Sequence, residues 1–185
     1  MHRNQNIHLK TYAILGFIFV AALGTLLHFT FEWSNQNRIV AFFSAVNESM
    51  WEHLKLLVFP FLIYSALEYI KLGPLFDNYI IAKAFGLLGG ILTMVTLYYT
   101  YSGIIGDHYL FMDIAISILG IIVSFSISCY IMNHRLLRAS IFQPIGVILI
   151  LLVIICFMWF TYFPPRINLF KDPPTGRYGY NMNYK

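Results

Sequence analysis

The sequence predicts an all-α fold, a polytopic membrane helix bundle of about five transmembrane helices, and three observations predict it. Of the 185 residues, 59% are hydrophobic and only 11% are charged, whereas soluble domains carry about 25% charged residues. The mean hydropathy is +0.70. Several apolar runs are about as long as the 20 residues that a helix needs to cross a bilayer. The lipid bilayer is therefore the expected partner of the surface, and no basic, aromatic-rich segment indicates a nucleic acid.

The apolar runs and the breaks between them place the elements. The first run is longer than a secretory h-region of about 7–15 residues and has no A-x-A cleavage site, so we expect an uncleaved first helix. An apolar stretch at 39–46 is too short to cross a bilayer and is expected to be interfacial or re-entrant. The predicted membrane-spanning helices are 12–31, 47–69, 79–101, 109–132 and 144–163.

Local signals refine these helices. Asn47 is the predicted N-cap of the second helix, with Glu48 in its first turn, where a carboxylate suits the helix dipole. Pro60 removes one backbone hydrogen bond from that helix and should kink it. The prolines Pro164 and Pro165 end the fifth helix. We therefore divide the chain into a transmembrane helix-bundle domain, 1–163, and a C-terminal polar tail or lid, 164–185.

Small residues predict which helices pack closely. They recur every four residues in the third and fourth predicted helices, and such stripes let helix backbones approach each other in lipid. The stripes are Ala82, Gly86 and Gly90, then Gly120, Ser124 and Ser128.

The positions of Lys and Arg predict the orientation, because cytoplasmic loops are enriched in both. Lys71, Arg135 and Arg138 lie in two loops on one side, whereas the loop around Asp107 and His108 has neither residue type. We therefore expect a cytoplasmic N-terminus and an extracytoplasmic C-terminus, although the tail also carries basic residues.

Ionisable groups gather toward the predicted outer face. Inserting each such group into a membrane costs roughly 2.5–3.5 kcal/mol on insertion scales, so a cluster of them indicates a structural or functional role that offsets this cost. His28 and Glu32 are four residues apart, as are Glu48 and Glu52, and Asp113 begins the small-residue face of the fourth helix. We expect a pocket that is built from these groups, with His53 and His108 at its rim and Trp51 either as its wall or as an interfacial anchor.

Carboxylates and imidazoles at helical spacing are how helix bundles build metal sites. A divalent metal is therefore the cofactor that the pattern favours, against the simpler reading that these groups only face water or pair with each other. Haem between two histidines also fits the residue types, but no spacing selects it. At the opposite end, Glu68 and Lys83 are expected to form a structural ion pair.

Two blocks of the sequence resemble a known family. Asn47-Glu48-Ser49-x-Trp51-Glu52-His53-Leu54-Lys55 and Asp172-Pro173-x-Thr175-Gly176-x-Tyr178-Gly179 are similar to motifs of small bacterial multi-pass membrane proteins that are catalogued only as a domain of unknown function. The resemblance implies a bacterial cell-membrane protein and a tail that is shaped rather than frayed. It implies no activity and no catalytic residues.

Three functions remain open at this point, and with them the question of whether the protein is an enzyme. The first is a metal or small-ligand site of a membrane hydrolase. Its looser analogy is to membrane metal-hydrolases with His and Asp at the mouths of their helices, but the HxxxH pair expected there is absent. The second is a small transporter or channel, expected to be a homo-oligomer because five short helices enclose little pathway alone. The third is a structural or assembly protein without a site.

Overall fold

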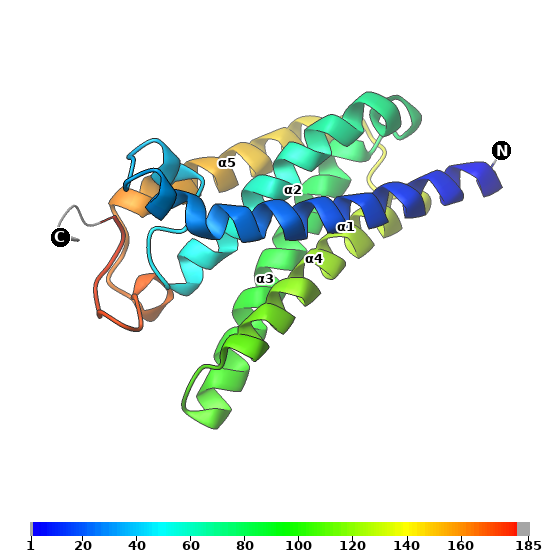
Figure 1. Cartoon of the computed structure of the whole chain (residues 1–185). Coiled ribbons are helices and arrows are strands. Elements are labelled where there is room, and N and C mark those ends of the chain that lie inside the picture. The colour runs from blue at the N-terminus through cyan, green and yellow to red at the C-terminus, as the bar shows by residue number, and fades with distance from the viewer. Residues whose placement is uncertain (1, 181–185) are drawn as a thin grey trace.

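The computed structural model describes residues 2–180, with side chains from residue 9 onward. Five long helices form the bundle (Figure 1): α1 (His2–Trp33), α2 (Met50–Leu72), α3 (Tyr79–Ile105), α4 (Leu110–Asn133) and α5 (Phe142–Tyr162). Three short 3₁₀ turns, Val40–Phe42, Gly73–Leu75 and Asn168–Phe170, lie in the connections. The all-α prediction is confirmed, and all five helices are long and apolar enough to cross a membrane.

The boundaries of α2 correct one prediction. The N-cap is Ser49 and not Asn47, because the Ser49 side chain accepts a hydrogen bond from the backbone N–H of Glu52. Asn47 and Glu48 therefore precede the helix, and Glu52 occupies its first turn. The Asn47 side chain instead accepts from the backbone N–H of Ser49. The helix continues through Pro60 to Leu72.

Helices α3 and α4 pack closely through their small residues. A Cβ atom on Gly90 would lie 1.9 Å from Oγ of Ser124, and one on Gly86 would lie 2.0 Å from Oγ of Ser128. Only glycine leaves room for these hydroxyls, and Ser128 uses the proximity to donate to the carbonyl of Ala82 at 3.2 Å. The two stripes thus meet, as small-xxx-small packing in lipid requires.

The connection between α1 and α2 and the C-terminal tail gather at one end of the bundle, whereas the turn between α3 and α4 stands apart from that end (Figure 1). Buried Phe31, Ala41 and Val46 form a small core there, with Tyr162 and Tyr180 packed against it. The described part of the tail, 164–180, contributes Tyr180 to this packing, and Lys171 and Tyr178 form an antiparallel bridge within it. This end of the molecule carries the candidate site.

Candidate functional site

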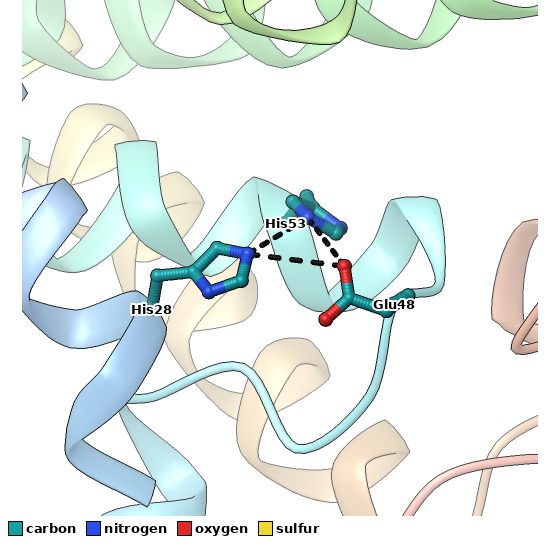
Figure 2. Close-up of side chains that lie close together, drawn as sticks. All are labelled: His28, Glu48 and His53. Carbon is teal, nitrogen blue, oxygen red and sulfur yellow. Dashed lines mark hydrogen bonds and ion pairs between the residues drawn. The ribbon is translucent and has the colours of Figure 1, made fainter. Parts of the chain in front are cut away.

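Three side chains from separate segments meet near the start of α2. His28 reaches in from α1, His53 from α2, and Glu48 from the loop before α2 (Figure 2). The Nε2 atoms of the two histidines are 3.3 Å apart. Oε2 of Glu48 lies 3.4 Å from Nε2 of His53 and 3.8 Å from Nε2 of His28. One ligand atom from each residue lies within 4.8 Å of the others, which is close enough to share a metal ion.

The hydrogen bond at the far side of the His53 ring sets its tautomer. Nδ1 of His53 lies 3.0 Å from the backbone carbonyl of Ser49. A carbonyl only accepts, so Nδ1 carries the proton and the Nε2 of the neutral ring carries a lone pair. That lone pair faces His28 and Glu48. Histidines that bind metals are commonly oriented by such a hydrogen bond from the second ring nitrogen.

The C-terminal tail holds Glu48 in place. The backbone N–H of Glu48 donates to Oδ1 of Asp172 at 2.9 Å, and Asp172 is only 3% exposed. Oδ2 of the same carboxylate accepts from the hydroxyl of Thr175. One turn of the tail is therefore built around Asp172, and it fixes the backbone of a residue 124 positions earlier. The side chain of neighbouring Asn47 also bonds the tail, at the carbonyl of Gly179.

The three side chains open into a cavity of about 270 Å³, which we call the polar cavity. Its walls come from α1, α2, α3, α4 and the tail. His28 and His53 are 31% and 26% exposed and Glu48 is 53% exposed, so a solute in the cavity can reach them. The lining residues are His28, Glu48, Met50, His53, Met94, Tyr98, His108, Leu110, Asp113, Ile116, Ser117 and Pro174.

Asp113 and His108 lie on the wall of the polar cavity that α4 and the turn before it provide. Nδ1 of His108 is 3.6 Å from Oδ2 of Asp113, and the hydroxyl of Tyr101 donates to Oδ1 of the same carboxylate. The sequence placed both residues at the pocket but gave no reason to include Tyr101. The one feature of the sequence that marks Tyr101 is its position next to Tyr98 and Tyr99 at the end of the predicted helix 79–101.

Glu52 does not belong to the cluster, which corrects the expected Glu48–Glu52 pair. It is 1% exposed, and its Oε2 accepts from Lys55 at 2.6 Å and from the backbone N–H of Val46 at 3.1 Å. Lys55 also donates to the carbonyls of Ala41 and Ser44. The physical reason is the start of α2: because Glu48 precedes the helix, the two carboxylates do not share a helix face. Glu52 and Lys55 instead organise the connection that carries Glu48.

Glu32 is also outside the cluster. It is exposed near the end of α1 and is not part of the polar cavity wall, although it is four residues from His28. The polar cavity lies between His28 of α1 and the residues of α2 and α4 that line it. Glu32, one turn beyond His28, lies past this cavity.

Trp51 does not take the first of its two expected roles, that of a wall of the polar cavity. The Trp51 ring stacks on Phe157 of α5 at 4.2 Å between centroids and packs on Phe170 at 4.7 Å. It therefore anchors α2 to α5 and the tail and does not wall the cavity. Tyr180 of the tail packs on Phe31 of α1, with 5.8 Å between the ring centroids.

A second charged pair is buried further along the bundle. Lys83 of α3 and Glu68 of α2 form an ion pair, and they are 2% and 3% exposed. The hydroxyl of Tyr79 donates to the same Glu68 oxygen at 2.6 Å. The Lys83 ammonium lies over three rings, at 5.0 to 5.4 Å from their centroids. Neither residue lines the polar cavity, so this pair joins helices rather than forming part of the site.

Comparison with known proteins identifies a family without assigning an activity. No curated protein and no solved structure matches the chain. The two sequence blocks that carried the resemblance, around Glu48 and around Asp172, are joined in the structure by the hydrogen bond between these two residues. The profile described as "Family of unknown function (DUF6512)" matches residues 1–180, and the chain therefore belongs to that family.

Proposed function

We propose that His28, Glu48 and His53 hold a zinc ion, and that the protein is a membrane-embedded zinc hydrolase. The observation that carries the proposal is the set of three separations between the ligand atoms, 3.3, 3.4 and 3.8 Å. In a tetrahedron the distance between two ligands is about 1.63 times the metal–ligand bond. Zinc bonds of about 2.0–2.2 Å to imidazole and carboxylate therefore separate the ligands by about 3.3–3.6 Å.

The electron pairs at the cluster support a cation there. Nε2 of His53 carries a lone pair, and it faces the Glu48 carboxylate oxygen at 3.4 Å. Both atoms are acceptors, so their contact is unfavourable unless a proton or a metal ion lies between them. A shared cation satisfies both atoms together with Nε2 of His28.

The donor set favours zinc over the other common divalent ions. Magnesium and calcium prefer oxygen ligands, whereas imidazole suits zinc and its neighbours among the transition metals. Two histidines and one glutamate form one of the recurring protein ligand sets of catalytic zinc, whereas structural sites use four protein ligands. Within the described residues the cluster offers three, and all three side chains line the polar cavity, from which a water or a substrate would supply the fourth ligand.

Hydrolysis is the chemistry that such a site supplies. Zinc polarises a carbonyl or phosphoryl oxygen and lowers the pKa of bound water. One water is consumed: its oxygen forms the new bond to carbon or phosphorus, the bond to the leaving group breaks, and the leaving group takes a proton. Asp113 and His108 on the α4 wall of the cavity are the groups of this chain placed to accept and return that proton.

The test is the metal content of the full chain, purified in detergent without chelators and then loaded with zinc. We expect about one zinc per chain by elemental analysis. Glu48→Gln and His53→Gln should lose the metal and keep the helical content of the parent protein. The matched control is Glu32→Gln, an exposed carboxylate outside the cavity, which should keep it. A hydrogen-bonded cluster without metal predicts instead that no variant differs in zinc and that Glu48→Gln lowers thermal stability.

A further inference from the structure

We infer that the substrate of the proposed zinc site is an amphiphile, with its hydrolysable head in the polar cavity and its apolar chain in a groove between α1 and α4. This inference rests on the proposed function and names the substrate class of the same site. Three features of the structure carry it.

The first feature is a second hollow that adjoins the polar cavity. It has a volume of about 450 Å³, within the range of about 300–1,000 Å³ that small-molecule pockets occupy. We call it the apolar groove. It shares His28, His53 and Asp113 with the polar cavity, so a molecule in the groove has one end at two of the three proposed metal ligands.

The second feature is the separation of polar from apolar groups along the groove. Its ionisable side chains are the three that it shares with the polar cavity, and elsewhere its lining is apolar except for the hydroxyls of Thr25 and Ser117, which donate to carbonyls of their own helices. Val20 and Leu57 form its floor on α1 and α2, where both are buried. A polar head at one end and an apolar chain along the rest match this arrangement, because burying a polar group without a partner is costly.

The third feature is where the groove opens. Ile114 and Ile118 of α4 and Phe29 of α1 line it and are 51%, 40% and 45% exposed. Both helices are apolar enough to cross a membrane, so in a bilayer these exposed side chains would face acyl chains rather than water. An amphiphile in the bilayer can therefore enter sideways between α1 and α4 without moving its chain through water.

The experiment uses two zinc-binding probes that differ only in chain length, acetohydroxamate and lauroyl hydroxamate. The full chain is loaded with cobalt in place of zinc, in dodecyl maltoside micelles. Binding of either probe at the metal changes the visible cobalt spectrum, which gives a dissociation constant for each. The readout is the ratio of the two constants, because general damage to the metal site weakens both probes together.

Ile118→Trp fills the groove from α4 and Thr25→Trp fills it from α1. The matched control for the first is Leu119→Trp, since Leu119 is 45% exposed on the same helix and lies outside the groove. The control for the second is Leu26→Trp, at 51% exposure on α1. Partition of the long probe into micelles is the same for every variant.

We expect both groove variants to weaken lauroyl hydroxamate on the order of tenfold relative to acetohydroxamate, because the chain loses its contacts, and both controls to leave the ratio unchanged. An unchanged ratio in Ile118→Trp and Thr25→Trp would overturn the amphiphile inference and leave the metal site standing. A protein that gives no cobalt spectrum at all would overturn the proposed function, and the inference with it.

Discussion

Removal of Lys83 tests how the buried ion pair of α2 and α3 contributes to stability. Lys83→Met leaves the Glu68 carboxylate buried without its cation, and the loss of one partner of a buried pair costs about 3–5 kcal/mol. Because the Tyr79 hydroxyl still donates to that carboxylate, we expect the low end, about 3 kcal/mol. The double variant Glu68→Gln/Lys83→Met removes both charges. Its free energy of unfolding should lie within about 1 kcal/mol of that of the parent protein.

The assay is unfolding by SDS titration from mixed micelles, followed by tryptophan fluorescence. The matched control is Lys71→Met, an exposed lysine near the end of α2, which should change the free energy of unfolding by less than about 0.5 kcal/mol. Two results would refute the reasoning. In one, Lys83→Met lowers the free energy of unfolding by no more than Lys71→Met does. In the other, the double variant is as unstable as the single variant, so that charge balance is not what the pair provides.

Two further predictions concern the tail and the helix contact. Asp172→Ala should lower the zinc affinity by about 10–100-fold, because the backbone N–H of Glu48 loses its acceptor and residues that orient a metal ligand have effects of this size. The affinity is measured by competition with a chelating dye. An unchanged affinity would show that the tail does not position the site. Gly90→Val should destabilise the bundle by about 1–3 kcal/mol, because a Cβ there would lie 1.9 Å from Oγ of Ser124. Gly103→Ala, with no neighbour within 4 Å of the added carbon, should be neutral in the same titration, and equal effects of the two changes would contradict the packing argument.

The bundle could be predicted from sequence because its signals are local. Span length and hydropathy are properties of single segments, so four of the predicted helices begin and end within four residues of observed ones, whereas α1 begins at His2, ten residues before its predicted start. The errors occur where a boundary depends on one hydrogen bond. Ser49 rather than Asn47 caps α2, so Glu48 precedes the helix and does not share a helix face with Glu52, which is buried.

The candidate site could be predicted only in part. His28, Glu48 and His53 stood out because ionisable groups are costly near lipid, and they meet in the structure. The role of Asp172 could not be derived from any local pattern, since its bond to Glu48 joins residues 124 positions apart. The apolar groove likewise depends on how α1 and α4 lie relative to each other, which periodicity within each helix does not determine.

The most direct test of the central claim is X-ray absorption at the zinc edge of the purified, zinc-loaded protein. The account predicts a four-coordinate shell of nitrogen and oxygen at about 2.0–2.2 Å, with the scattering pattern of two imidazole rings, and no zinc edge above background in His53→Gln prepared in the same way. A shell with sulfur at about 2.3 Å, from Cys129 or Cys156, or a shell unchanged by His53→Gln, would contradict it.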